Sequence, residues 1–469
     1  MASESSKKIV IFLMLGLLTA SAFFMRLENF KNSKMRSIDE VVYYRMAKQV
    51  LKYGSSGYHT MPYGKEMADS GRDLPDYFFK PLFKHPPVFT FLLSFSMRIF
   101  GKTLLSAEYV ALLFGVLLIP LTFFIGKELF DSRIAMAAAI FMWIDPVSVI
   151  TSQKVWMDTT MSFFMLLSLF FFIRGMNLKR GYYFLLGGLA CGLAMLTKYT
   201  GILVLVTMIS VAFVHRRELF FKKAFIFGLI LPFMMLLPWA YWNYRVYGGE
   251  FLVLQQSFHH NRRLVPLLLL GVIIWTLFRI VRKLTERFSQ DGETVLPETK
   301  GLTKKKVNIA LGFFLMGGVV ASIIYSLQLD HLPRTSWAGS IFKLEPPIFY
   351  VGQLIEYSFI YFFAFAALFI DREDDLIGRV SLKYASVITL VFFTVWRSFQ
   401  CRYILFIIPL LVILGFELIF TMFRKIDKID RVFLRMALSN ALVLLVLYAI
   451  ARTLYIDVFL SFGNDMCYY

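Results

Sequence analysis

Two adjacent carboxylates, Asp39 and Glu40, stand in a polar stretch directly after the first hydrophobic segment of the chain, Ile9 to Met25. A carboxylate at a membrane surface can act as a general base and take the proton of a hydroxyl group. The alternative is structural: both acids would begin a helix, where the dipole favours negative charge, with Ser37 as N-cap and Glu40 completing a capping box. The residues alone leave both roles open.

Other polar residues that suit phosphate chemistry stand between the hydrophobic segments. They are Lys84 and His85, Asp158, Lys198, the run that contains His259, His260, Arg262 and Arg263, then Arg397, and the pair Arg402 and Tyr403. Guanidinium and ammonium groups stabilise phosphate charge in a transition state. Singly, each has a structural explanation: Lys198 would interrupt a helical hairpin, and Arg402 would reach from a helix end toward the interface. Because ionisable groups at membrane depth are costly, the whole set favours a functional site.

The composition indicates what must position these residues. Of the 469 residues, 58% are hydrophobic and 17% are charged, whereas soluble proteins carry about 25% charged residues. The apolar runs are continuous and do not alternate, which excludes a membrane barrel and indicates an all-α polytopic membrane protein. The net charge of +19 comes from basic residues between these runs, so it indicates topology and no nucleic-acid partner. Three scattered cysteines exclude a disulfide framework and a thiolate metal site.

About thirteen transmembrane helices are expected at roughly 20 residues per crossing. The predicted spans are 9–25, 104–126, 134–151, 159–174, 182–197, 200–214, 224–242, 264–281, 307–326, 349–370, 383–396, 403–423 and 433–456. Alternate connections are rich in Lys and Arg and are therefore cytoplasmic, among them the charged loop 282–306. The first span could pass for a cleavable signal peptide, but its apolar run continues to Met25 and favours an uncleaved anchor.

One short segment decides on which side the acidic residues lie. Pro87 to Phe100 is apolar but about fourteen residues long, too short to span the bilayer comfortably. We therefore expect a juxtamembrane helix within a long first external loop, 26–103, which also contains a helix from Asp39 to Tyr53. This scheme puts the loop and Asp158 on the same, extracytoplasmic face.

A series of motifs in this chain resembles the GT-C membrane glycosyltransferases, above all the dolichyl-phosphate-mannose protein mannosyltransferases and the lipid A aminoarabinose transferases. The motifs are, in order, Asp39-Glu40-Val-Val-Tyr-Tyr, Lys84-His85-Pro86-Pro87 before a stretch that ends in Phe100-Gly101, Val155-Trp-Met-Asp158, Gly188-Leu-Ala-Cys-Gly-Leu-Ala-Met-Leu-Thr-Lys198, Leu237-Pro-Trp239, and Arg402-Tyr403-Ile-Leu-Phe-Ile-Ile-Pro409. No single motif is specific, but the ordered series runs over most of the chain.

The resemblance implies one GT-C membrane domain, 1–469, that moves a sugar from a polyprenyl monophosphate, dolichyl or undecaprenyl, to a hydroxyl of a protein, lipid or glycan. By position, Asp39 matches the catalytic base of an inverting displacement, and Asp158 matches the second acidic residue of the site. Glu40 would assist. The residues that would surround the donor phosphate are Lys84, His85, Arg262, Arg263, Arg402 and Tyr403, with Lys198 and Arg397 as further candidates.

The chain departs from the aminoarabinose transferases at a metal ligand. Those enzymes have Glu-Lys-Pro where this chain has Lys84-His85-Pro86, and their Glu helps to hold a metal. A charged Lys84 cannot be a ligand, and the basic residues could neutralise the phosphate without a metal. His259 or His260 together with His85 could still bind a divalent ion such as zinc. The chain also ends soon after its last predicted span, and we expect no large soluble C-terminal domain.

The main alternative is a polytopic transporter or flippase of a lipid-linked sugar. It would predict charges deep within spans and two similar halves, whereas the ionisable residues here cluster at span ends and in external loops. A structural scaffold would leave the polar residues of one face unexplained. We expect a multi-pass protein of a prokaryotic plasma membrane or an ER-type membrane. The sugar, the polyprenyl carrier, the acceptor and the oligomeric state stay open.

Overall fold

The computed structural model describes residues 4–32, 37–58, 85–250, 346–370, 377–394 and 400–456, and all regular structure in these ranges is helical. The helices are α1 (Glu4–Asn32), α2 (Ile38–Tyr53), α4 (Val88–Phe100), α5 (Leu104–Leu129), α6 (Ser132–Ile144), α7 (Pro146–Ser152), α8 (Asp158–Leu178), α9 (Tyr182–Thr197), α10 (Ile202–His215), α11 (Lys223–Tyr247), α15 (Pro346–Tyr357), α16 (Ile360–Phe369), α17 (Ile377–Thr394), α18 (Ile408–Ile426) and α19 (Val432–Tyr455). Short 3₁₀ segments connect some of them: η1 (Gly54–Gly57), η3 (Tyr199–Gly201), η4 (Arg217–Phe221) and η5 (Cys401–Ile407).

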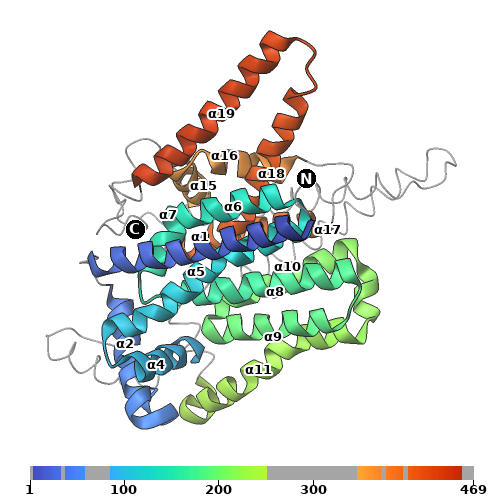
Figure 1. Cartoon of the computed structure of the whole chain (residues 1–469). Coiled ribbons are helices and arrows are strands. Elements are labelled where there is room, and N and C mark those ends of the chain that lie inside the picture. The colour runs from blue at the N-terminus through green and yellow to red at the C-terminus, as the bar shows by residue number, and fades with distance from the viewer. Residues whose placement is uncertain are drawn as a thin grey trace.

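The long helices form an antiparallel bundle of membrane-spanning length. Six helices in the described ranges are long and apolar enough to cross a bilayer, and the bent pair α6 and α7 makes a seventh. α1, α5, α6, α8, α9 and α11 run side by side, with α5 against α6 and α9 between α8 and α11 (Figure 1). The all-α, polytopic prediction is thus confirmed. The predicted spans 264–281 and 307–326 lie outside the described residues, so the number thirteen stays a prediction.

Two predicted spans are each broken into two helices, which the hydrophobic pattern did not reveal. The predicted span 134–151 bends by 54° between α6 and α7. At the bend, the Asp145 carboxylate accepts the backbone N–H of Ser148 at 2.8 Å and so caps α7, and Pro146 is the first residue of α7. The predicted span 349–370 is divided between α15 and α16, where the Ser358 hydroxyl accepts the N–H of Ile360. Each break has a side chain that satisfies the new helix start.

Two shorter helices pack across one end of the bundle. α4 has 13 residues, about 20 Å at 1.5 Å per residue, which is shorter than the ~30 Å hydrocarbon core. It packs against α2, α5 and α9, and Figure 1 shows α2 and α4 together at the lower left. Their shared apolar cluster includes Tyr43, Phe89 and Leu93. The sequence-based expectation of a short helix within the first loop agrees with this arrangement.

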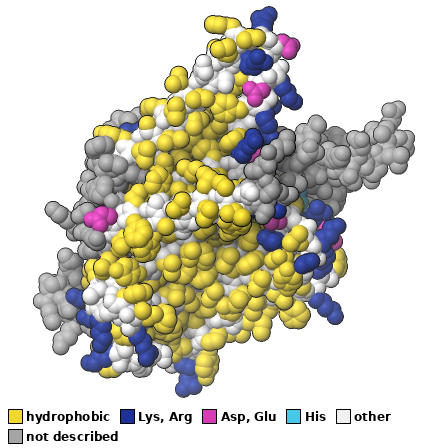
Figure 2. Space-filling model, in the orientation of Figure 1, with side chains coloured by type: hydrophobic (Ala, Val, Ile, Leu, Met, Phe, Trp, Pro, Cys, Tyr) yellow, Lys and Arg dark blue, Asp and Glu magenta, His cyan; other side chains and the backbone are white. Residues whose placement is uncertain are grey.

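The surface has the charge pattern of a membrane protein. Figure 2 shows a broad hydrophobic face over the side-by-side helices, with Lys and Arg side chains gathered where those helices begin and end. The connections α8–α9 and α10–α11 lie at the right of the bundle in Figure 1, opposite α2 and α4. The bundle therefore has two distinct polar ends, and α2, α4 and the start of α8 share one of them.

Candidate active site

Asp39 is held at the start of α2 by an ion pair with a residue far along the chain. Its Oδ2 accepts Nη2 of Arg402 at 2.9 Å. The Asp39 side chain is 39% exposed, whereas that of Arg402 is 7% exposed. The open side of this ion pair is therefore the carboxylate, which a substrate could reach.

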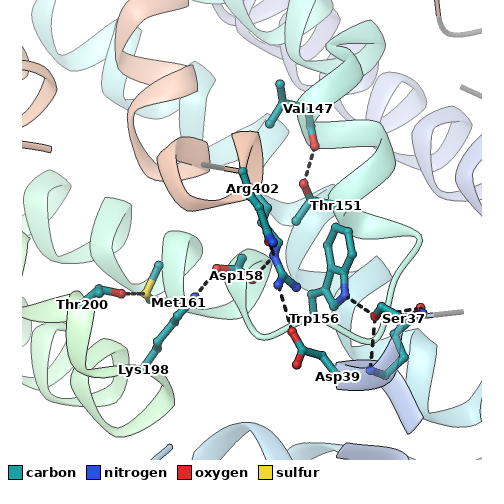
Figure 3. A network of polar contacts seen from close by, with 12 residues as sticks. Ser37, Asp39, Val147, Thr151, Trp156, Asp158, Met161, Lys198, Thr200 and Arg402 are labelled. Carbon is teal, nitrogen blue, oxygen red and sulfur yellow. Dashed lines mark hydrogen bonds and ion pairs between the residues drawn. The ribbon is translucent and has the colours of Figure 1, made fainter. Parts of the chain in front are cut away.

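Asp158 is the second carboxylate, and it is enclosed. It is the first residue of α8, its side chain is 2% exposed, and its Oδ1 accepts Nζ of Lys198 at 2.8 Å. Its Oδ2 lies 3.8 Å from Nε of Arg402, an ion pair without a hydrogen bond. Lys198 stands in extended backbone between α9 and η3, where the sequence predicted a break between two spans. The two acids thus share Arg402, as Figure 3 shows.

Arg402 lies in η5, and its guanidinium packs near the rings of Trp156 and Tyr403. Its guanidinium carbon is 4.2 Å from the ring centre of Trp156 and 5.5 Å from that of Tyr403. Nε of Arg402 also donates to the side-chain oxygen of Gln400. A guanidinium over an aromatic face keeps favourable electrostatic contact while its N–H groups point elsewhere. The ring of Tyr403 in turn lies 4.6 Å from Nζ of Lys198 and stacks on Phe393.

Glu40 has a structural position, unlike its neighbour Asp39. Its Oε2 accepts the backbone N–H of Ser37 at 2.8 Å, and its own N–H donates to the Ser37 hydroxyl, so the predicted capping box is present. Its Oε1 accepts the N–H of Val155 at 3.1 Å. The indole N–H of Trp156 donates to the Ser37 hydroxyl at 2.9 Å. These bonds join the start of α2 to the loop that precedes Asp158.

Tyr43 and His85 adjoin the two acids. Tyr43, one turn along α2 from Asp39, is buried and packs edge to face on His85 with ring centres 6.0 Å apart. Burial, helped by the Asp39 carboxylate, raises the pKa of Tyr43 well above its ordinary value. The phenol is therefore protonated at neutral pH and cannot serve as a base there. The carbonyl of His85 accepts the hydroxyl of Tyr58 at 2.8 Å, which fixes the backbone of this motif.

The structure thus brings together five of the residues expected at the site, and two others fall beside it. Asp39, Asp158, Lys198, Arg402 and Tyr403 form one cluster from four separate parts of the chain. His85 lies behind Tyr43, and Glu40 supports the backbone. The other candidates, Lys84, His259, His260, Arg262, Arg263 and Arg397, lie outside the described residues.

The described part of the site does not fit a metal centre. Both carboxylates are paired with cationic side chains. Within the ranges that the structure describes, no three His, Cys, Asp or Glu residues come together as ligands. The candidates His259 and His260 lie outside those ranges, so the metal stays a prediction and no chemical step below depends on it.

Sequence reasoning missed the supporting role of Trp156 and Gln400. Trp156 stands two residues before Asp158, and Gln400 two residues before Arg402. Trp is common at membrane interfaces, and a single Gln carries no distinctive signal, so neither residue stood out from its type. Their position so close to a site residue was the one available signal.

Comparison with known proteins adds a family model to this geometry. Residues 84–242 match the model described as dolichyl-phosphate-mannose-protein mannosyltransferase. The matched range includes His85, Asp158 and Lys198, whereas Asp39 and Arg402 lie outside it. No curated protein sequence matches the chain.

Solved structures match over almost the whole chain. The archaeal oligosaccharyltransferase AglB from Archaeoglobus fulgidus, in complex with an inhibitory peptide and a dolichol-phosphate, matches with a TM-score of 0.59 and 16% identity over 98% of this chain. ArnT from Cupriavidus metallidurans matches in the apo state with a TM-score of 0.55 and 16% identity over 99% of this chain and 78% of its own. ArnT bound to undecaprenyl phosphate matches with a TM-score of 0.56 and 14% identity, over 97% of this chain and 76% of its own.

The chain has the GT-C glycosyltransferase fold. The resemblance that the motifs indicated is therefore confirmed at the level of fold. The chain spans 56% of AglB, a little over half of that protein's length. The GT-C fold places the polar cluster of Asp39, Asp158, Lys198 and Arg402 at one end of a membrane bundle.

Proposed function

We propose that this chain transfers a sugar from a polyprenyl monophosphate to an acceptor hydroxyl, with Asp39 as the general base. The observation that carries the proposal is the accessible Asp39 carboxylate, 2.9 Å from Arg402, in a GT-C fold. A carboxylate next to a guanidinium provides both parts that the reaction needs, namely a proton acceptor and a cation for phosphate.

The reaction would be a direct displacement at the anomeric carbon. Asp39 takes the proton of the acceptor hydroxyl as its oxygen attacks that carbon from the face opposite the phosphate. The bond between the anomeric carbon and the phosphate oxygen breaks, and its electron pair stays on the phosphate. The products are the inverted glycoside and the polyprenyl monophosphate, and the leaving phosphate needs no protonated acid.

Exposure and bonding favour Asp39 over the other groups of the site. Asp158 is almost fully buried and bonded to Lys198. Glu40 is fully buried, and both of its oxygens accept backbone N–H groups. Tyr43 is buried and remains protonated. Among the described residues around the cluster, Asp39 therefore suits the base best, and Asp158 suits a fixed partner that orients Lys198 and Arg402.

The donor would be bound by its phosphate next to Arg402, with its polyprenyl tail along the hydrophobic face of the bundle. Solved structures of the same fold hold dolichol-phosphate in AglB and undecaprenyl phosphate in ArnT, which supports this class of donor. From the sequence, Lys84, Arg262, Arg263 and Arg397 would add positive charge, and His85 and Tyr403 would line the same region. The acceptor would be a hydroxyl of a protein, lipid or glycan.

The site would face the extracytoplasmic side of the membrane. The basic connections at the α8–α9 and α10–α11 turns lie at the opposite end of the bundle from α2 and α4. Positively charged short loops stay on the cytoplasmic side. A donor delivered in the outer leaflet would then meet Asp39 directly.

The test is the Asp39→Asn variant of the full chain. Loss of a general base typically lowers the rate by about 10²–10⁴-fold, so sugar transfer should fall by that amount while polyprenyl phosphate still binds. The measurement is mass spectrometry of glycans and lipids from cells that contain the protein, the variant or neither. Glu218→Gln, an exposed carboxylate in η4 at the other end of the bundle, is the matched control and should leave transfer unchanged.

The same variant separates this proposal from a transporter or flippase of a lipid-linked sugar. A transporter should tolerate Asp39→Asn and should alter the distribution of the lipid-linked sugar without altering any acceptor. Sugar transfer that persists in Asp39→Asn would exclude Asp39 as the base.

A further inference from the structure

The starting observation is that Arg402 divides its guanidinium between the accessible and the enclosed acid. The contact with Asp39 is a hydrogen-bonded ion pair of 2.9 Å, and the contact with Asp158 is a longer ion pair of 3.8 Å. Lys198, the other cation of the cluster, is bonded to Asp158 at 2.8 Å. Arg402 is therefore the cation whose main partner stands at the open side of the site.

Among the four described residues Asp39, Asp158, Lys198 and Arg402, the formal charges balance. Asp39 and Asp158 provide two negative charges, and Arg402 and Lys198 provide two positive charges. A lipid phosphate adds at least one negative charge to the cluster. Lys198 would have to leave a carboxylate that is 2% exposed, and an unpaired buried charge is costly. Arg402 would leave Asp39, whose side chain is 39% exposed and can be solvated by water in its place. Asp158, which lies 3.8 Å from Arg402, would keep its hydrogen bond with Lys198.

The contacts of the Arg402 side chain allow its guanidinium to rotate. Its guanidinium lies near the Trp156 ring and its Nε donates to Gln400. A guanidinium can rotate over an aromatic face and keep its cation–π attraction. The planar guanidinium forms bidentate hydrogen bonds with a phosphate as well as with a carboxylate. A move from Asp39 toward a phosphate can therefore keep the contact of the guanidinium with the Trp156 ring.

From these contacts we infer that Asp39 and the donor phosphate compete for Arg402, so that arrival of the phosphate releases Asp39 to act as the base. This inference rests on the proposed function and deepens it. In the pair with Arg402, Oδ2 of Asp39 already accepts a guanidinium N–H. When Arg402 turns to the phosphate, Asp39 loses a cation and gains a nearby anion, and both changes increase its affinity for a proton. The acceptor is therefore activated only when a donor is in place.

The test is a double-mutant cycle on binding, with the full chain in detergent or nanodiscs and undecaprenyl monophosphate as the probe. Asp39→Asn removes the competitor and should tighten binding. Arg402→Gln removes the shared cation and should weaken it. In the Arg402→Gln background, Asp39→Asn should tighten binding by much less, since only charge repulsion is relieved. The expected difference between the two backgrounds is about ten-fold in Kd, within the range for coupled neighbours.

Two controls keep the cycle interpretable. Arg402→Lys keeps the positive charge and should retain part of the coupling, and each variant must elute as a single species with a cooperative thermal transition. Glu218→Gln should alter binding in neither background. If Asp39→Asn tightens binding equally in the presence of Arg402 and in the Arg402→Gln background, or not at all, Arg402 is not shared and the inference fails.

The outcome is independent of whether the chain transfers sugar. Coupled binding without any sugar transfer would overturn the proposed function and leave the competition for Arg402 intact. Sugar transfer that depends on Asp39 but shows no coupling in binding would overturn the competition alone.

Discussion

Asp39 and Glu40 are chemically alike and adjacent, and their surroundings give them opposite roles. Glu40 is buried and uses both oxygens to join the start of α2 to the loop before Asp158. Asp39, one position earlier, points toward Arg402 and remains accessible. Adjacent residues of a helix project about 100° apart, so one carboxylate can face the protein while the other faces the site. The sequence raised both roles, and the structure gives Glu40 the structural one.

The indole of Trp156 connects this support to Arg402, and Trp156→Phe removes its N–H while a smaller aromatic ring remains. In Trp156→Phe, the Ser37 hydroxyl loses its indole donor while an aromatic face remains under Arg402. We expect the hydrogen bond to account for about 0.5–1.5 kcal/mol of lost stability, in addition to a packing cost for the smaller buried ring, with a smaller loss of transfer than in Asp39→Asn. Thermal unfolding of the purified protein measures the change.

Trp143→Phe is the matched control for that variant. The indole N–H of Trp143 is buried and has no hydrogen-bond partner among the described residues, so its removal should cost no hydrogen bond. Equal losses of stability in both Phe variants would mean that the bond between Trp156 and Ser37 contributes nothing.

Part of this site was predictable from residue types alone. Charged side chains among apolar runs are rare, which is why Asp158, Lys198 and Arg402 stood out. Their pairing was not predictable, because Asp39 and Arg402 are 363 positions apart and many charged pairs would have satisfied the same pattern. The family resemblance predicted the order of the motifs, and the structure shows which of them lie together.

At the scale of elements, the break between α6 and α7 is the feature that positions the loop before Asp158. Asp145 accepts the N–H of Ser148 and the hydroxyl of Tyr361 in α16. Arg26, at the end of the first hydrophobic segment, is buried and donates to the carbonyls of Gly115 and Met142 and to the Ser148 hydroxyl. Several helices thus meet at this bend. Hydropathy treats residues 134–151 as one apolar run, since a single acid within it barely lowers the mean.

Removal of one hydroxyl from this bend tests its contribution. Tyr361→Phe takes a donor from the buried carboxylate of Asp145. An acceptor left without its partner in a buried site costs about 1–3 kcal/mol, so the thermal transition should shift downward.

The matched control is Tyr109→Phe in α5. The Tyr109 hydroxyl makes no hydrogen bond with the described residues, and its ring packs on Phe100, so this change should be nearly neutral. A Tyr361→Phe protein as stable as Tyr109→Phe would show that the bend does not depend on the hydroxyl.

At the scale of the whole molecule, the pattern of apolar runs and basic connections predicted the polytopic helical class, and the GT-C fold agrees with it. The alternation of runs also predicted that residues near α2 and the start of α8 share one face, and both lie at the same end of the bundle in Figure 1. The broken spans and the docking of α2 and α4 on the bundle were not predictable, because hydropathy measures how apolar a segment is and not where it bends or what it touches.

The orientation of the whole bundle follows from one short helix and can be tested directly. If α4 lies at the surface, Lys102, which follows it, is extracytoplasmic, and Lys222, before α11, is cytoplasmic; both side chains are exposed. Cys191 and Cys401 are buried, so reporters with one accessible cysteine each, Lys102→Cys and Lys222→Cys, can be built in a Cys467→Ser background. A membrane-impermeant maleimide should label the first in intact cells and the second only after permeabilisation.

The reverse labelling would show that the bundle has the opposite orientation and that Asp39 lies on the cytoplasmic side. Labelling of both in intact cells would mean that the number of crossings between them is even, and the proposed delivery of donor from the outer leaflet would have to be abandoned.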